Sequence, residues 1–297
     1  MDEFIMTTVI LVGLCSLFAT LLAFAYKKLR VYEDPRIDHV EERLPGANCG
    51  ACGEPGCRAF AEKVVAGNIN PGACTVSPEE GVQRIADYLG IEPSRETKRV
   101  ARLLCAGGKS EAQNLSEYKG GMATCRGETV VAGGPKECSW GCLGLGDCET
   151  ACTFGAITMS ADGLPVVDAS KCTACNDCVE VCPKQLFTLM PVTQKLLVQC
   201  RSLLDGDLAE TKCSVACTAC GRCAADAAPG LITMENNLAV IHYELNAIAT
   251  PHAVKRCPTN AIVWLTGEDQ FVPKSTSHSL PLGRVASGIN LEDIYYQ

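Results

Sequence analysis

The stretch that decides the fold runs from residue 138 to residue 183 and reads CSWGCLGLGDCETACTFGAITMSADGLPVVDASKCTACNDCVEVCP. Its eight cysteines form two groups of four, first Cys138, Cys142, Cys148 and Cys152, and then Cys172, Cys175, Cys178 and Cys182. The second group has the spacing C-x2-C-x2-C-x3-C and is followed directly by Pro183. The first group is spaced x3, x5 and x3, and Thr153 follows it in place of a proline. The second group therefore carries the more specific pattern.

The spacing of the second group is the one that binds iron–sulfur clusters in bacterial ferredoxins. Three closely spaced thiolates bind one cluster there, whereas the fourth cysteine binds the neighbouring cluster. Applied to this chain, the interleaving predicts two [4Fe–4S] clusters. The predicted ligand sets are Cys138, Cys142, Cys148 and Cys182 for one cluster and Cys152, Cys172, Cys175 and Cys178 for the other. Zinc explains the stretch less well, because a zinc site needs only four tetrahedral ligands and no trailing Cys-Pro.

The composition favours small modules built around inorganic cofactors. The chain has 297 residues, enough for two or three domains, with 21 cysteines and few aromatic residues. A disulfide framework does not fit, because the number of cysteines is odd and the chain is not a short secreted one. The formal net charge of −8, without any basic stripe, argues against a nucleic-acid partner.

The N-terminal segment has the features of a membrane anchor. Residues 4–26 contain no charged side chain and are long enough to cross the lipid bilayer as one helix. Lys27, Lys28 and Arg30 follow directly, which predicts a single pass through the inner (cytoplasmic) membrane with the soluble part on the cytoplasmic side. In a cleaved signal peptide, the alternative, the positive charges would precede a shorter apolar run. Cys15 is expected to pack within the helix.

A first soluble module follows the anchor. Cys49, Cys52, Cys57 and Cys74 are spaced x2, x4 and x16, with glycines between the first three. Cys57 begins an apolar-periodic segment, so we expect a helix whose free N-terminal amides face an anionic cluster. The four cysteines are predicted to bind a [4Fe–4S] cluster, and a structural zinc ion remains the alternative.

The C-terminal part repeats the twin-cluster unit. A shift of 75 residues lays Cys213, Cys217 and Cys223 on the first three cysteines of the 138–183 stretch, and Cys257-Pro258 corresponds to its end. One of the two ligand sets is missing from the repeat, which therefore predicts a single [4Fe–4S] cluster. Its expected ligands are Cys217, Cys220, Cys223 and Cys257, with Cys213 in place of Cys220 as the alternative.

These predictions define an α+β chain with a single N-terminal transmembrane helix, a small helical four-cysteine iron–sulfur module and tandem ferredoxin-like units. The expected segments are the anchor (1–26), a linker (27–43), the four-cysteine module (44–95), a connecting segment (96–137), the twin-cluster unit (138–195), the single-cluster unit (196–265) and an extended tail (266–297). A short buried strand is expected near residues 98–105. Cys105 and Cys125 could be ligands of a further cluster, but they have no partners at cluster spacing and are expected to be free buried thiols; Cys200, in a setting like that of Cys105, is assigned no role either. The expected total is four [4Fe–4S] clusters.

The order of these motifs resembles that of the electron-transport B subunit of the Rnf complex, the ion-translocating ferredoxin:NAD oxidoreductase of bacteria and some archaea. The resemblance extends to about residue 265 and implies that the chain takes electrons from soluble reduced ferredoxin. It also implies that other subunits of the membrane complex reduce NAD and move sodium ions or protons. The residues agree with this division, because no GxGxxG motif, no P-loop and no charge in the membrane span are present. No catalytic residue is expected.

Two other functions remain open from the sequence. The chain has the features expected of an iron–sulfur subunit serving another membrane complex, such as a hydrogenase or a dehydrogenase. A zinc-stabilised scaffold without redox work is the alternative from a different class of protein. Bound iron and acid-labile sulfide distinguish the scaffold from both electron-transfer functions.

Overall fold

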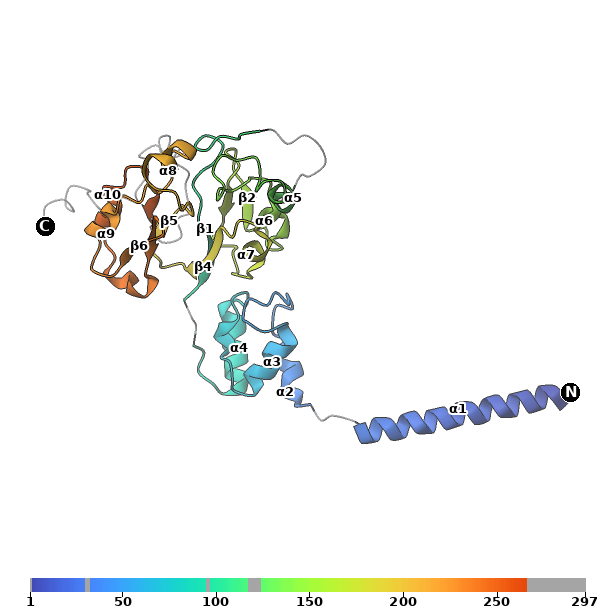
Figure 1. The fold of residues 1–297 in the computed structure, drawn as a ribbon. Coiled ribbons are helices and arrows are strands. Elements are labelled where there is room, and N and C mark those ends of the chain that lie inside the picture. Colours follow the sequence, from blue (N-terminus) through green and yellow to red (C-terminus); the bar gives the residue numbers. More distant parts are fainter. Residues whose placement is uncertain (1, 30–32, 95–96, 117–123, 266–297) are drawn as a thin grey trace. The chain divides into compact units, whose positions relative to one another are not determined.

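A computed structural model describes residues 2–29, 33–94, 97–116 and 124–265 (Figure 1). The expected C-terminal tail, 266–297, lies outside the described residues. The chain divides into two compact units, which we describe separately. The first unit comprises residues 1–48, 54–71 and 77–93, and the second comprises 49–53, 72–76 and 94–297.

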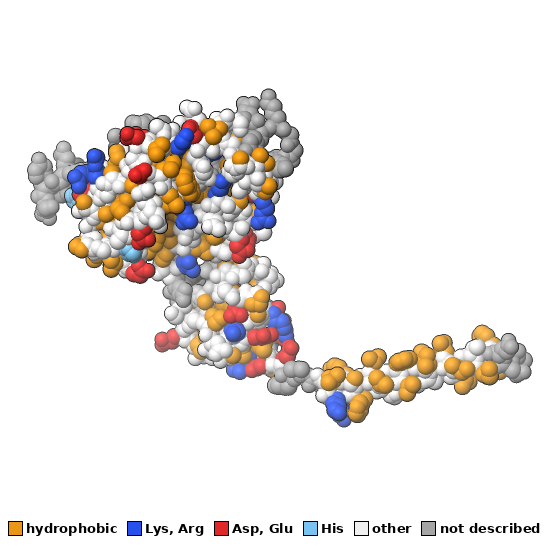
Figure 2. Space-filling view, viewed as in Figure 1, with side chains coloured by type: hydrophobic (Ala, Val, Ile, Leu, Met, Phe, Trp, Pro, Cys, Tyr) orange, Lys and Arg blue, Asp and Glu red, His pale blue; other side chains and the backbone are white. Residues whose placement is uncertain are grey.

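The first element, α1 (Asp2–Leu29), is the predicted apolar helix. Its apolar side chains are exposed along the helix, and Lys27 and Lys28 lie in its last turn (Figure 2). By length and composition, the segment from Phe4 to Leu29 can cross a membrane. The helix extends three residues beyond the apolar run that the sequence defines, because the two lysines and Leu29 continue the same helical turn.

Short helices form the rest of the first unit. They are α2 (Pro35–Glu41), α3 (Cys57–Val65) and α4 (Glu79–Leu89); a 3-10 turn, η1 (Pro71–Ala73), lies at the boundary between the units. Val40, Phe60 and Ile85 are buried almost completely. Part of the predicted linker (27–43) is therefore ordered as α2, because Asp34 accepts a hydrogen bond from the Arg36 amide at 2.9 Å and Val40 packs in the core.

The second unit contains two copies of one strand arrangement. Its described strands are β1 (Arg99–Leu103), β2 (Ile157–Met159), β3 (Pro165–Val167), β4 (Phe187–Pro191), β5 (Leu196–Val198), β6 (Ile232–Glu235), β7 (Leu238–Ile241) and β8 (Ile262–Trp264). In the first copy β1 pairs with β4 and β2 with β3; in the second β5 pairs with β8 and β6 with β7, all antiparallel. In each copy, the first strand thus pairs with the last, and the two strands between them in the sequence form a hairpin.

This pairing changes one expected boundary. The short strand predicted near residues 98–105 is present as β1, with four of its five residues buried. In the register of β1 with β4, Ala101 lies opposite Leu189. The first ferredoxin-like copy therefore begins at β1 and not at Cys138, because its outer strand comes from the segment that the sequence suggested was a connection.

Short helices connect these strands. They are α5 (Cys125–Val130), α6 (Asp147–Ala151), α7 (Asp177–Val181), α8 (Gly206–Lys212), α9 (Arg222–Asp226) and α10 (His252–Lys255), with a 3-10 segment η2 (Tyr243–Ile248). Leu164, Leu186, Leu196 and Leu231 are almost completely buried in one core that spans both copies. Several of the candidate ligand cysteines belong to the same core, whereas Cys220 is exposed.

Candidate metal centres

Cavities in the described part of the second unit are lined by groups of four cysteines. Site 1 has Cys152, Cys172, Cys175 and Cys178; site 2 has Cys125, Cys142, Cys148 and Cys182; site 3 has Cys217, Cys220, Cys223 and Cys257; the junction site has Cys105, Cys138, Cys200 and Cys213. Each cavity encloses about 310 to 380 Å³ of empty space, including the part open to solvent.

The four thiols of each cavity match the ligand number of a [4Fe–4S] cluster. Among the described residues, no three histidine, cysteine, aspartate or glutamate side chains converge closely enough to hold one metal ion. Zinc in a structural site requires four sulfur atoms at about 2.3 Å from one point.

Three loops with the same pattern of positive φ angles supply eight of these cysteines, all of them in sites 1, 2 and 3. The loops are 142–148, 172–178 and 217–223. The second and fourth residues after the first cysteine of each loop have positive φ angles, at Gly144, Gly146, Ala174, Asn176, Ala219 and Gly221. A short helix begins on the next residue and carries the last cysteine of the loop in its first turn. The repeated conformation turns the chain around one point and directs its thiols into a cavity.

Site 1 contains the predicted set without change. Cys172, Cys175 and Cys178 come from one loop, and Cys152 follows α6. The Ala101 N–H donates to Cys172 Sγ at 3.4 Å, and the Ala156 N–H donates to Cys152 Sγ at 3.3 Å. Amide donors of this kind stabilise thiolate charge and tune the potential of a bound cluster.

Site 2 differs from the predicted set by one residue. The structure places Cys125 with Cys142, Cys148 and Cys182, whereas Cys138 lies in the junction site. The reason is visible in the loop: Leu145 occupies the position that Cys175 and Cys220 occupy in the other loops. The Leu145 amide hydrogen-bonds the Cys125 thiol, which thus takes the place of the missing loop thiol.

Asp147 holds Cys125 in this position. Its carboxylate accepts hydrogen bonds from the backbone N–H of Cys125 at 3.0 Å and of Arg126 at 3.1 Å. These contacts join the start of α5 to the start of α6, although the two helices are well separated in sequence. Cys125 was expected to be a free thiol because it has no neighbour at cluster spacing; no signal in the local sequence identifies it.

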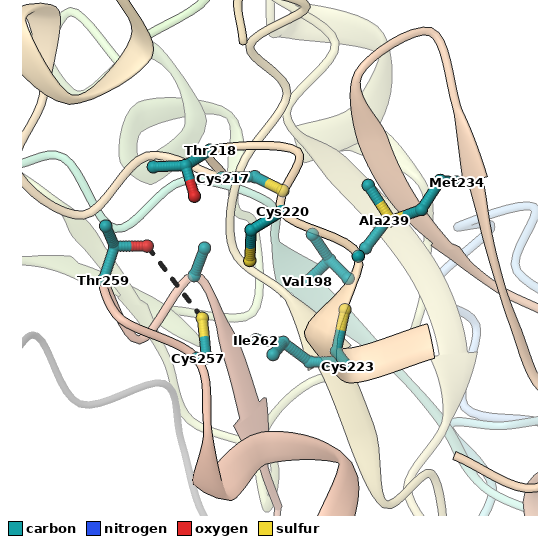
Figure 3. A pocket seen from close by; sticks show the side chains of 12 residues that line it. Val198, Cys217, Thr218, Cys220, Cys223, Met234, Ala239, Cys257, Thr259 and Ile262 are labelled. Atoms are coloured by element: carbon teal, nitrogen blue, oxygen red, sulfur yellow. Dashed lines mark hydrogen bonds between the residues drawn. The ribbon is translucent and has the colours of Figure 1, made fainter. Parts of the chain in front are cut away.

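Site 3 contains the favoured set of the second copy. Figure 3 shows Cys217, Cys220, Cys223 and Cys257 around one cavity, with the thiol of Cys257 at 3.9 Å from the hydroxyl of Thr259. Thr259 itself donates to the Ala216 carbonyl at 2.6 Å. Cys213, the alternative ligand, lines the junction site instead.

Burial keeps several of these thiols protonated when no metal is bound. Burial, with a smaller contribution from neighbouring cysteines, raises the pKa of Cys148 and Cys178 to about 12 and that of Cys223 to about 11. A thiolate is the form that binds metal, so cluster binding must displace these protons.

The four cysteines of the N-terminal module, Cys49, Cys52, Cys57 and Cys74 (the N-terminal set), are divided between the two units. Cys57 begins α3 in the first unit, and its N–H donates to the Asn48 side chain at 2.8 Å. Cys49, Cys52 and Cys74 lie in short segments that belong to the second unit. Their joint binding of a cluster therefore stays a prediction from their spacing.

Comparisons with known families support iron–sulfur binding. Residues 44–76 match a family described as "Putative Fe-S cluster", and residues 164–187 match a "4Fe-4S binding domain". The first match covers the whole N-terminal set, and the second covers the C-terminal group of the 138–183 stretch. The chain thus has iron–sulfur domains, including one of the [4Fe–4S] type.

Similar proteins extend over most of the chain. The B subunit of the Na(+)-translocating ferredoxin:NAD(+) oxidoreductase complex of Acetobacterium woodii is 40% identical over 90% of this chain and 80% of its own. The proton-translocating counterpart of Clostridium ljungdahlii is 36% identical over 88% and 93%, and the B subunit of an ion-translocating oxidoreductase complex of Methanosarcina acetivorans is 35% identical over 85% and 95%. These values confirm the resemblance seen in the cysteine motifs: the chain belongs to the family of iron–sulfur B subunits of ion-translocating ferredoxin:NAD oxidoreductase complexes.

Proposed function

We propose that this chain carries electrons from reduced ferredoxin into a membrane complex whose other subunits reduce NAD and translocate ions. The names of the relatives in Acetobacterium and Clostridium support the donor and the acceptor. The observation that carries the proposal is that sites 1, 2 and 3 each gather four cysteines around one cavity, with most of these cysteines packed in or against one apolar core.

The residues of the chain fit such a role. A bound iron–sulfur cluster accepts and releases one electron at a time. The cysteines hold the cofactor, the backbone amides stabilise its negative charge, and the leucines exclude water. Sites 1 and 2 are close neighbours, because the charge of Cys148 raises the pKa of Cys178 across the boundary between them.

The proposed cofactors of this function are four [4Fe–4S] clusters. They occupy the N-terminal set and sites 1, 2 and 3, with Cys125 replacing Cys138 in site 2 and with Cys220 preferred to Cys213 in site 3. The proposed location of the soluble part is the cytoplasmic side of the membrane, because positive charges follow the apolar helix.

Reduction by ferredoxin tests the proposal directly. The full-length chain, purified anaerobically in detergent, is mixed with reduced ferredoxin while the bleaching of its visible absorption is followed. We expect rapid bleaching, and slower or smaller bleaching in a Cys172→Ala, Cys175→Ala double variant that lacks two ligands of site 1. A chain that binds clusters but is not reduced by ferredoxin would contradict the proposed donor. A colourless zinc protein would contradict electron transfer altogether.

A further inference from the structure

The junction site lies where the two ferredoxin-like copies meet, and each copy supplies two of its four cysteines. Cys105 follows β1 by two residues, and Cys200 follows β5 by two residues. Cys138 precedes the first loop cysteine of its copy by four residues, as Cys213 does in the other copy. The cavity is therefore lined by two pairs of structurally equivalent cysteines, as expected at an approximate two-fold axis.

Hydrogen bonds hold the two copies together around this cavity. The Ala106 N–H donates to the Gln199 carbonyl at 3.0 Å, directly beside Cys105 and Cys200. Lys212 pairs with Glu137 at 2.7 Å, directly beside Cys213 and Cys138. Each cysteine is thus adjacent in sequence to a residue that crosses the junction, so its position is set by the contact between the copies.

The sulfur atoms of this cavity have backbone N–H donors. The Cys142 N–H donates to Cys105 Sγ and the Ser202 N–H to Cys200 Sγ, both at 3.4 Å. The backbone amides of Trp140 and Val215 lower the pKa of the thiols of Cys138 and Cys213 against the larger effect of burial. In three of the four cysteines the donor lies two residues further along the chain, as it does for Cys175 in site 1. Such donors stabilise a thiolate, whereas a thiol that only fills space does not require them.

A buried cation beside the cavity also indicates that an anion belongs there. Lys136 is 9% exposed, and its ammonium group donates to the carbonyl oxygens of Gly107 and Cys142. No carboxylate among the described residues forms an ion pair with it, and carbonyl groups do not neutralise its charge. Its positive charge acts on Cys138 and Cys213, whose pKa values it lowers against the larger effect of burial. A buried charge without a counter-charge is costly, and a thiolate-bound cluster supplies that counter-charge.

The backbone next to the cavity leaves room for sulfur. A Cβ atom at Gly107 would lie 2.8 Å from Cys213 Sγ, closer than the two atoms can approach. The empty space of this cavity is about 310 Å³, similar to that of sites 1 to 3. Glycine at this position thus preserves a space in which the thiol of Cys213 lies beside that of Cys105.

We propose that Cys105, Cys138, Cys200 and Cys213 bind a further [4Fe–4S] cluster, the fifth of this chain, at the junction of the two ferredoxin-like copies. Only the role of this cluster in electron transfer rests on the proposed function. The binding of the cluster to the four cysteines can be measured separately. With this assignment, every cysteine of the chain except Cys15 belongs to a set of four.

The junction site lies between site 2 and site 3. Cys142 of site 2 hydrogen-bonds Cys105, and the backbone of Cys217 of site 3 hydrogen-bonds the Cys200 thiol. The described cavities therefore follow one another in the order site 1, site 2, junction site and site 3. A cofactor at the junction joins the twin sites of the first copy to the single site of the second.

The test is the iron and acid-labile sulfide content of the full-length chain, purified anaerobically and reconstituted to constant absorbance. We expect about 20 iron and 20 sulfide per chain, four of each for every cluster. The Cys200→Ala, Cys213→Ala double variant should lose about 4 of each, and so should the Cys105→Ala, Cys138→Ala variant. Cys15→Ala is the control for substitution of a cysteine outside the sites and should lose none.

Unchanged iron in both double variants would overturn the proposal, as would the loss of zinc instead of iron. If neither double variant folds, Cys200→Ala alone takes their place, and an iron content equal to that of the wild type overturns the fifth cluster. These results are independent of the electron donor. Double variants that keep the wild-type iron content and are still reduced by ferredoxin refute the junction cluster alone, whereas a wild-type chain with about 20 iron that ferredoxin cannot reduce refutes only the proposed function.

Discussion

The replacement of Leu145 by cysteine tests why site 2 draws a ligand from a distant helix. The loop 142–148 has the same positive φ positions as the other two loops but carries Leu145 where they carry a middle cysteine. Cys125 fills this vacancy from α5. We therefore expect Cys125→Ala to lose one cluster and the Cys125→Ala, Leu145→Cys double variant to regain it, now with a C-x2-C-x2-C loop.

The expected size of the effect follows from the structure. Cys125→Ala should lower the content by about 4 iron and 4 sulfide per chain, one cluster's worth. The local fold should persist, because alanine keeps the backbone N–H that donates to Asp147. Leu145 is half-buried and outside the main core, so its change to cysteine should cost only about 1 kcal/mol of unfolding free energy.

The assay is iron and sulfide analysis together with electron paramagnetic resonance of the reduced chain. Leu145→Cys alone is the matched control and should keep the wild-type iron content. Full iron content in Cys125→Ala would refute the placement of Cys125 in site 2. Failure of Leu145→Cys to restore the lost cluster, in a chain that keeps its other clusters, would refute the equivalence of the three loops.

Further variants test the other sites and the anchor. Cys220→Ala should abolish the cluster of site 3 and leave those of sites 1 and 2, which electron paramagnetic resonance of the reduced chain will show; retention of all clusters would favour another ligand. Gly144→Ala places a side chain at a φ of +77° with its Cβ 2.6 Å from the Gly163 carbonyl oxygen, so cluster occupancy of site 2 should fall, as iron analysis measures. Leu231→Ala empties a fully buried position and should cost about 2 to 5 kcal/mol, seen as faster thermal loss of the visible absorption than in the wild type. Deletion of residues 1–33 should release the chain from the membrane fraction into the supernatant on centrifugation, and continued sedimentation with membranes would show another means of attachment.

The local patterns of the sequence were sufficient for a large part of the fold and of the sites. The uncharged run near the N-terminus predicted α1, and the buried segment before Cys105 predicted β1. The C-x2-C-x2-C spacing is a property of one loop, so the set of site 1 could be expected from neighbouring residues. The same applies to the cysteines 217, 220 and 223 of site 3, since the spacing and the turn conformation belong together.

The order of α2 and the boundary of the first ferredoxin-like copy were less accessible from the sequence. A charged segment with a proline suggested a linker, but the cap by Asp34, the buried Val40 and the ion pairs of Arg58 in α3 with two acidic side chains of α2 hold α2 against α3. The outer strand β1 pairs with a strand more than eighty residues away, and such long-range pairing has no local signature. The sequence therefore predicted the strand β1 but not its pairing with β4.

The class of cofactor can be inferred from the amino-acid sequence alone, because the number of thiolates and their spacing within a loop are chemical requirements of the cluster. How the remaining cysteines are shared depends on the folded chain. Cys125 reaches site 2 because Asp147 joins α5 to α6, and Cys138 leaves that set because the contact between the two copies places it with Cys105, Cys200 and Cys213. Cysteines from separate segments meet only after the strands have paired and the two copies have packed against each other, so no spacing along the chain can specify their partners.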